Sequence, residues 1–398
     1  MPDTTTDWRQ LEDRYLMNTA KRLPVTVVRG EGTRLWDDAG KEYLDFLTGP
    51  STVSLGHSHP VLLQALSEQA KALIHVTGTI PSIPQVKLAR LLVENSCLDR
   101  AFFCNSGAEA NEGAIKLARK WGKQRRNGAY EIICALNAFH GRTLATVTAT
   151  GTEKYKAPFT PLPEGFVHVP FNDVEAIKRA TTDKTAAVLL EPVQCEGGVN
   201  VPSDDYLRGV RRWCDEQGVL LILDEVQTGI GRLGALFAYQ LYGVEPDVMT
   251  LAKGMGSGVP IGAFLAKEHC SVLEPGDHGS TFGGNPLMTH AAYAVCKYII
   301  DNDVPAQAAA RGRYLERKLR GLEDRFPFIG EVRGKGLIWA MEFDREMAEE
   351  VVLACLAEGL IANNVRPTTL RFCPPLTVSE DEIDQAAAIV ERVLARHG

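Results

Sequence analysis

The chain has 398 residues, of which 45% are hydrophobic and 23% charged, and its net charge is −7. One domain takes about 100–200 residues, so this length predicts two or three globular domains. The acidic balance and the lack of a Lys/Arg block argue against a nucleic-acid partner. No apolar run approaches the roughly 18 residues that span a bilayer, and residues 1–11 do not resemble a secretory signal. We therefore expect no membrane partner.

The nine cysteines are scattered and include no Cys-x-x-Cys pair. That pattern predicts neither a metal knuckle nor a redox pair. Scattered thiols are typical of a reducing cytosol, so we expect a cytoplasmic protein without a metal site.

The first 45 residues resemble an extended entry segment, in which 25–28 and 34–36 flank a glycine turn and predict a small hairpin. From about 60 to 270, short apolar runs alternate with helical patterns such as 110–121 and 206–217. The candidate strands are 101–104, 131–134, 187–190, 219–223, 248–252 and 262–265. This alternation predicts an α/β fold with a mostly parallel sheet covered by helices.

After about residue 290, long helical patterns at 291–300, 306–326 and 346–358 surround short strands. The change predicts a second, smaller α+β domain. We expect an N-terminal segment, 1–50, that packs with this small domain, a large domain at 51–287 and the small domain at 288–398.

Two predicted strands each deliver an ionisable residue to the carboxyl edge of the sheet. The run 219–223 ends in Asp224, and 248–252 ends in Lys253, which glycines follow. Ligands of open α/β sheets bind at this edge. An acid and a lysine there suit pyridoxal phosphate, which takes a lysine Schiff base and an acidic partner for its ring nitrogen. Alternatively, both residues mark only the solvent boundary of the sheet.

Residues 105–109, Asn-Ser-Gly-Ala-Glu, lie between a predicted strand and a predicted helix. Backbone N–H groups and the Ser106 hydroxyl at such a helix start can hold a phosphate. Ser106 and Glu109 also match a capping box, which leaves a purely structural function open.

Three further residues are candidates for binding a planar ring or a carboxylate. Phe139 follows a strand and can stack on a ring, and Arg142 can hold a carboxylate with two hydrogen bonds. Arg371 lies in an otherwise apolar strand, where an arginine needs a partner. A structural salt bridge is one explanation, and a pair with Glu196 that opens for a substrate carboxylate is the other.

Two other motifs are typical of other enzyme classes, but each departs from the pattern of its class. Residues 229–234 match the G-x-G-x-x-G dinucleotide pattern, but five residues separate them from the strand, which predicts a loop. Residues 56–60 resemble a hydrolase elbow, but Pro60 replaces the last glycine. His57 and His59 lack an acid or cysteine ligand at matching spacing, so a turn before a helix is expected there.

Taken together, these segments resemble the class III (subgroup II) pyridoxal-phosphate aminotransferases, from about residue 24 to the C-terminus. The matching stretches are 55–60, 105–111, 139–143, 191–194, 224–231, Lys253, 279–286 and 370–376. The resemblance implies the type I fold of this cofactor class, with a mostly parallel seven-stranded sheet in the large domain. It also implies a homodimer with active sites shared across the two-fold interface.

The resemblance implies a function for each matching residue. Lys253 and Asp224 are expected to be catalytic. The expected cofactor-binding residues are Ser106, Gly107, Ala108, Phe139, Asp224, Glu225, Val226, Gln227, Lys253 and Thr281, the last from the partner subunit. The expected substrate-binding residues are Arg142, Glu196, Ser280 and Arg371.

Within the family, the chain is most similar to members that move the terminal amine of N-acetylornithine to 2-oxoglutarate. Donors such as ornithine, succinylornithine and 4-aminobutyrate stay open. Cys195 stands where the subgroup usually has glycine, and 48–53 differs from the usual donor loop. An aminomutase or decarboxylase with the same cofactor also stays open, as does a nicotinamide oxidoreductase that uses 229–234.

Overall fold

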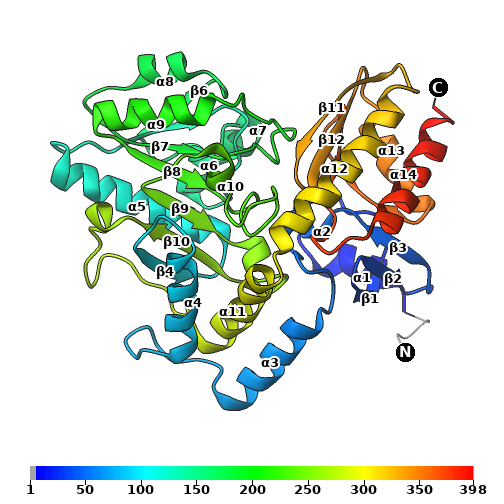
Figure 1. Ribbon diagram of the computed structural model, residues 1–398, viewed down its shortest axis with the longest axis horizontal. Coiled ribbons are helices and arrows are strands. Elements are labelled where there is room, and N and C mark those ends of the chain that lie inside the picture. The colour runs from blue at the N-terminus through cyan, green and yellow to red at the C-terminus, as the bar shows by residue number, and fades with distance from the viewer. Residues whose placement is uncertain (1–5, 398) are drawn as a thin grey trace.

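The computed structural model describes residues 6–397, and a seven-stranded sheet forms its centre (Figure 1). The strand order is β4-β10-β9-β8-β7-β5-β6. The strands are β4 (Arg100–Cys104), β5 (Glu131–Ala135), β6 (Phe166–Val169), β7 (Thr185–Leu190), β8 (Leu220–Asp224), β9 (Val248–Leu251) and β10 (Gly262–Ala266). Only β10 runs antiparallel to its neighbours, which confirms the mostly parallel α/β sheet.

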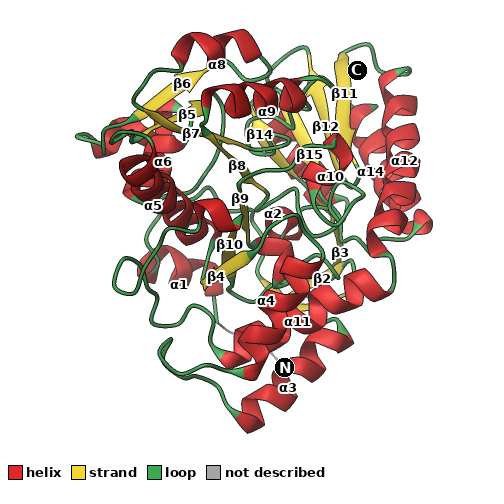
Figure 2. Ribbon diagram, turned by 60° about the vertical axis from the view of Figure 1, so that its left-hand side comes forward, coloured by secondary structure: helices red, strands yellow, loops and turns green. Residues whose placement is uncertain are grey.

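Helices cover both faces of this sheet because successive strand residues point to opposite sides. In β8, Leu221 and Leu223 belong to the apolar cluster that includes α9 (Tyr206–Gln217), whereas Ile222 belongs to the cluster of α5 (Gly107–Arg125). The two helices lie on opposite sides of the strands in Figure 2. The predicted helices at 110–121 and 206–217 are therefore confirmed. Strand β6, at one edge of the seven-stranded sheet, is not among the predicted strands.

A second part of the molecule lies beside the carboxyl edge of the central sheet (Figure 1). One sheet has the order β1-β2-β3-β13, and another has the order β11-β12-β15-β14. Their strands are β1 (Val27–Glu31), β2 (Arg34–Asp37), β3 (Glu42–Asp45), β11 (Ile329–Lys335), β12 (Ile338–Phe343), β13 (Leu360–Ile361), β14 (Asn363–Arg366) and β15 (Thr369–Phe372). The helices here are α12 (Val304–Glu323), α13 (Ala348–Ala357) and α14 (Glu380–Leu394).

The expected hairpin is β1–β2, and the N-terminal segment pairs with the C-terminal part of the chain through β3 and β13. The domain limits at 50/51 and 287/288 stay a prediction, and residues 1–5 of that segment lie outside the described residues.

The remaining helices connect these layers. They are α1 (Trp8–Tyr15), α2 (Thr48–Ser51), α3 (Pro60–Ala72), α4 (Ile83–Glu94), α6 (Leu144–Ala149), α7 (Glu153–Lys156), α8 (Val174–Ala180), α10 (Ala238–Tyr242) and α11 (Pro286–Asp301). His59 is the N-cap of α3, which confirms a turn before a helix at that motif. Within residues 6–397, no helix combines the length and apolarity that crossing a membrane requires, and no His/Cys/Asp/Glu group suits a metal ion.

Candidate active site

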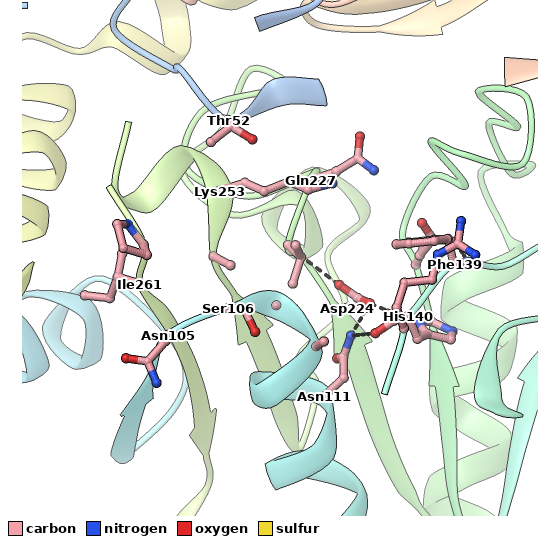
Figure 3. Close-up of a pocket in the computed structure, with 18 of the residues that line it drawn as sticks. Thr52, Asn105, Ser106, Asn111, Phe139, His140, Asp224, Gln227, Lys253 and Ile261 are labelled. Carbon is pink, nitrogen blue, oxygen red and sulfur yellow. Dashed lines mark hydrogen bonds and ion pairs between the residues drawn. The ribbon is translucent and has the colours of Figure 1, made fainter. Parts of the chain in front are cut away.

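A cavity of about 420 Å³ opens at the carboxyl edge of the central sheet (Figure 3). Its walls come from the ends of β4, β5, β7, β8 and β9 and from the start of α5. The residues that line it include Thr52, Asn105, Ser106, Gly107, Ala108, Asn111, Phe139, His140, Arg142, Glu191, Asp224, Val226, Gln227 and Lys253. The structure thus brings together most of the site residues that the sequence singled out.

Asp224 ends β8 and is 4% exposed. Its Oδ1 accepts a hydrogen bond from the Val226 N–H at 3.0 Å, and its Oδ2 accepts one from Asn111 Nδ2 at 2.7 Å. His140 Nδ1 lies 2.8 Å from the same Oδ2. These contacts fix the orientation of the Asp224 carboxylate at the cavity.

Asn111 and His140 are the residues that sequence reasoning missed at this carboxylate. Asn111 lies on the inner face of α5, donates also to the His140 carbonyl at 2.8 Å, and accepts from the Thr250 hydroxyl at 2.8 Å. Both residues lie inside the stretches 105–111 and 139–143, which carry the family resemblance. A polar residue on an otherwise apolar helix face was the available signal for Asn111.

Lys253 follows β9 after one residue, Ala252, and lines the same cavity as Asp224 (Figure 3). Its backbone is in the left-handed region, with φ of 39°, which costs a non-glycine residue about 1–2 kcal/mol. Burial lowers the pKa of its amine, although the Glu196 carboxylate opposes the shift. A lowered pKa increases the fraction of neutral, nucleophilic amine.

The start of α5 forms one end of the cavity. Ser106 is the N-cap, and its hydroxyl accepts a hydrogen bond from the Glu109 N–H at 3.2 Å. Glu109 accepts in turn from the backbone of Asn105 rather than from Ser106. Ser106 therefore caps the helix. The N-terminus of this 19-residue helix faces the cavity, and an anion is favoured there.

Phe139 and Val226 border the cavity between these two ends. The Arg142 guanidinium lies at the cavity wall, 5.3 Å from the Phe139 ring and 3.8 Å from the Tyr155 ring. Arg142 is exposed and forms no ion pair within residues 6–397, so its cation is available to a ligand.

Glu191 also lines the cavity, 5% exposed, and accepts a hydrogen bond from the Phe139 N–H at 3.1 Å. Burial and the neighbouring Asp224 carboxylate raise its pKa well above the usual range. Two carboxyl groups thus lie near each other, and the Asp224 carboxylate adds to burial in disfavouring the charged form of Glu191.

The predicted pair of Arg371 and Glu196 is present beside this cavity. Arg371 is fully buried in β15, and its Nη1 donates to Glu196 Oε1 at 2.7 Å. Gln227 Nε2 donates to the same oxygen at 2.9 Å. Burial opposes ionisation, yet the Arg371 cation prevails and lowers the pKa of Glu196 to about 2. Arg371 Nη2 and Gln227 Oε1 are buried without a hydrogen-bond partner, so this cluster retains unused polar groups.

The donor loop singled out by sequence lies on the same side. Thr52 lines the cavity, and the Thr48 hydroxyl donates to the Cys373 carbonyl at 2.7 Å, two residues beyond Arg371. Thr48 and Ser51 have φ of 52° and 62°, so this loop holds two non-glycine residues in the left-handed region.

Five predicted site residues lie outside the cavity lining: Glu196 and Arg371, which lie beside it, and Glu225, Ser280 and Thr281. Glu225 turns away from the cavity, and its carboxylate accepts from the Ala238 and Tyr239 N–H groups at 2.5 and 2.7 Å, at the start of α10. Ser280 Oγ accepts from the Asn105 amide at 3.1 Å, and Thr281 is exposed to solvent. The glycine motif at 229–234 forms turns and opens no helix, as expected for a loop.

Known proteins match almost the whole length of this chain, in agreement with the geometry of the site. The family model for class-III aminotransferases matches residues 15–394. The chain belongs to this family. An acetylornithine aminotransferase from Gloeobacter violaceus is 51% identical over 391 residues, which is 98% of each protein. One from Caldanaerobacter subterraneus subsp. tengcongensis is 50% identical over 96% of this chain and 98% of its own length.

Solved structures of other class-III aminotransferases have the same fold. The ornithine aminotransferase from Toxoplasma gondii has a TM-score of 0.95 at 34% identity, covering 99% of this chain and 96% of that one. The acetylornithine aminotransferase from Elizabethkingia anophelis has a TM-score of 0.87 at 34% identity, covering 98% of each chain.

Class-III aminotransferases use pyridoxal phosphate, and the cavity of this family member fits that group. The Lys253 amine has no hydrogen-bond partner within residues 6–397 and faces a cavity that also contains the Asp224 carboxylate. At the phosphate end, a Cβ on Gly107 would lie 2.7 Å from Val226 Cγ1, so only glycine permits this close approach. A covalent amine, an acid and an anion-binding helix start are the three features that this cofactor requires.

Proposed function

We propose that this aminotransferase moves the terminal amine of N-acetylornithine to 2-oxoglutarate, which gives a semialdehyde and glutamate, as a step of arginine biosynthesis. The observation that carries the proposal is the Arg371–Glu196 ion pair beside Lys253, because it suits two substrates of different charge. The acetylornithine aminotransferases that share about half of its residues support the choice of donor.

Bound pyridoxal phosphate supplies an electron sink for the carbanion that forms when the substrate loses a proton. We assign Asp224 the function of holding the proton on the ring nitrogen, because an opposite charge favours the protonated form. Asn111 and His140 keep that carboxylate oriented. Phe139 and Val226 flank the ring.

Lys253 would hold the cofactor, and its amine, when free, would accept the proton that the substrate carbon loses. Its lowered pKa suits this function, since a general base works best when its pKa is near the operating pH. The left-handed backbone at Lys253 aims the amine into the cavity.

Ser106, Gly107 and Ala108 are assigned to the cofactor phosphate, at the N-terminus of α5. Gln227 is assigned to the 3-hydroxyl of the ring. In this structure Gln227 donates to Glu196, so the same amide joins the cofactor end of the site to the substrate end.

Two arginines are assigned to substrate carboxylates. Arg142 holds the carboxylate of the donor remote from its reacting amine. Arg371 holds the α-carboxylate of 2-oxoglutarate or glutamate through its unpaired Nη2. Glu196 neutralises Arg371 while the donor, which has no carboxylate next to its reacting amine, is bound.

We assign Ser280 and Thr281 to the partner subunit's active site in a homodimer. The exposed apolar side chains near them support a covered surface: Ile74, Ile80, Ile83, Val86 and Phe282 are all more than half exposed. The His75 and Phe282 rings lie 5.6 Å apart, which places these segments together. Sedimentation should give twice the mass of the chain, and Thr281→Ala should weaken cofactor binding. A monomer with full activity would contradict this assignment.

A cytoplasmic location is part of the proposal, because all nine cysteines are free thiols.

A panel of amino donors tests the choice of substrate. N-acetylornithine, ornithine, succinylornithine and 4-aminobutyrate are each assayed with 2-oxoglutarate, and kcat/KM values are compared. We expect N-acetylornithine to give the largest value. The likeness to ornithine aminotransferases makes ornithine the second candidate, and a larger kcat/KM for ornithine would replace the proposed donor while keeping the acceptor.

The reaction class has its own test. We expect the enzyme to transfer the amine to 2-oxoglutarate in two half-reactions that can be measured separately. An aminomutase or decarboxylase would show no dependence on 2-oxoglutarate.

A further inference from the structure

The glycine motif at 229–234 contains a buried arginine that the proposed reaction does not use. Arg232 is 2% exposed, yet it forms no ion pair with any acid in residues 6–397. Burial lowers the pKa of its guanidinium, and its Nη2 has no hydrogen-bond partner. A buried cation without an acid costs stability, so its retention needs an explanation.

The side-chain hydrogen bonds of Arg232 cross to the second part of the molecule. Its Nη1 donates to the Leu337 carbonyl at 3.0 Å and to the Pro374 carbonyl at 2.5 Å. The Leu337 N–H donates back to the Arg232 carbonyl at 2.9 Å. Arg232 thus joins three chain segments through hydrogen bonds: the loop after β8, the β11–β12 turn and the segment after β15.

Two of these segments carry the groups that hold Glu196. Gln227 starts the loop after β8, five residues before Arg232, and Arg371 lies three residues before Pro374. Both side chains donate to the same oxygen of Glu196. The distance between the two segments therefore sets whether one carboxylate oxygen can meet both donors, and Arg232 spans that gap.

We infer that Arg232 is a positioning residue that holds the Gln227 loop and the Arg371 strand at the separation needed for the Glu196 pair to open and close. Arg232 acts through backbone carbonyls and touches no ligand. Because the pair that it positions handles the α-carboxylate of 2-oxoglutarate, its effect falls on the half-reaction with that acceptor. This inference rests on the proposed use of Arg371 for the α-carboxylate of 2-oxoglutarate.

The backbone of the motif is built for this placement. Gly231 and Gly234 have φ of 89° and 101°, which other residues adopt only with strain. A Cβ on Gly336 would lie 2.4 Å from the Arg232 carbonyl oxygen. The glycines thus permit Arg232 and the β11–β12 turn to approach closely, which explains the G-x-G-x-x-G pattern without a dinucleotide.

The test separates the two half-reactions in single-turnover experiments on the cofactor-loaded dimer, followed by the absorbance of the bound cofactor. Arg232→Met and Arg232→Lys are each reacted with the amino donor alone and, after conversion to the amine form, with 2-oxoglutarate alone. We expect the 2-oxoglutarate step to slow about tenfold or more, since a displacement of about 1 Å can cost 100-fold. The donor step should change less than threefold, on the order of the usual surface effect.

Arg126 offers a matched control. It also binds backbone carbonyls of distant segments, Thr185 and Gly218 among them, without an acidic partner, but it lies at the opposite end of the sheet. Arg126→Met should leave the ratio of the two half-reactions unchanged. Equal slowing of both half-reactions in the Arg232 variants, or no slowing in either, would overturn the inference.

Two further variants keep the test decisive. If Arg232→Met does not fold, Arg232→Gln, which keeps a neutral donor for the same backbone carbonyls, should give the same selective loss. In a Glu196→Ala background, the Arg232→Lys effect on the acceptor step should shrink, because the pair it positions is gone. A wild-type enzyme that does not react with 2-oxoglutarate would refute the proposed function instead, before any variant is measured.

Discussion

The two sides of the cavity differ in how completely their polar groups are satisfied. On the floor, both oxygens of the Asp224 carboxylate have partners, namely Val226, Asn111 and His140, and the unpaired polar atom of this network is His140 Nε2. On the wall beside Glu196, Arg371 Nη2 and Gln227 Oε1 are buried without partners. A satisfied buried network is rigid, whereas unpaired buried groups are costly until a ligand meets them.

This difference matches the two tasks that the proposed function gives to the site. The floor faces the same cofactor ring throughout the reaction, so its geometry can be fixed. The wall meets two substrates in turn, so its ion pair must exchange one carboxylate for another. Substitutions on each side test this division between a fixed floor and an exchangeable wall.

The largest effect is expected for Lys253→Ala. Loss of both the covalent amine and the proton carrier should lower kcat by about 10⁴-fold or more, since general acid–base catalysis alone contributes about 10²–10⁴-fold. The variant should also lose the visible absorbance of the cofactor bound through lysine. Lys267→Ala, which removes a lysine paired with Glu245, is the control and should retain activity. Normal turnover by Lys253→Ala would refute the mechanism.

Asp224→Asn tests the fixed floor. Removal of one partner from a buried charge pair costs about 3–5 kcal/mol, so kcat/KM should fall by roughly 10²–10⁴-fold. The adjacent Glu225→Gln should lower it far less, because that carboxylate holds the start of α10 instead of lining the cavity. Equal losses in the two variants would place Glu225 in the site after all.

Glu196→Ala tests the exchangeable wall. Without this carboxylate, Arg371 stays available to an α-carboxylate at all times. The rate with glutamate relative to N-acetylornithine should rise about tenfold, because a hydrogen bond to a charged group contributes about 1.5–3 kcal/mol. Glu268→Ala, which removes an exposed pair with Arg100, should leave the ratio unchanged. An unchanged ratio in Glu196→Ala would contradict the exchange.

The smallest effect concerns stability alone. Burial raises the pKa of Glu225 to about 7, although two backbone N–H groups oppose the shift. The folded state therefore holds this proton more tightly than the unfolded state, and the free energy of unfolding should fall as the pH rises from about 4.5 through about 7. The loss is at most about 3 kcal/mol. Urea titrations across this range should show a flatter profile for Glu225→Gln, and an equally steep profile would contradict the assignment.

Part of the fold and of the site could be predicted because it depends on short stretches of chain. The runs before Asp224 and Lys253 are strands β8 and β9, which are neighbouring parallel strands, so their carboxyl ends had to meet at one edge. Ser106 and Glu109 lie within one helical turn, and the predicted cap is present. By contrast, the half-buried strand β6 has only four residues and was missed, because so short a segment shows little alternation.

By itself, the sequence determined the α/β order, the two strand ends that face each other, and the helix start that suits a phosphate, since periodicity and capping act over a few residues. Only the tertiary structure decided which polar groups pair. Asn111 lies 113 positions from Asp224, and Glu196 lies 175 from Arg371. It also turned Glu225 away from its neighbour Asp224 and buried Arg232 between the two parts of the molecule. Such pairs form because packing removes water from both partners at once. A short stretch of sequence does not show which distant residue becomes the partner.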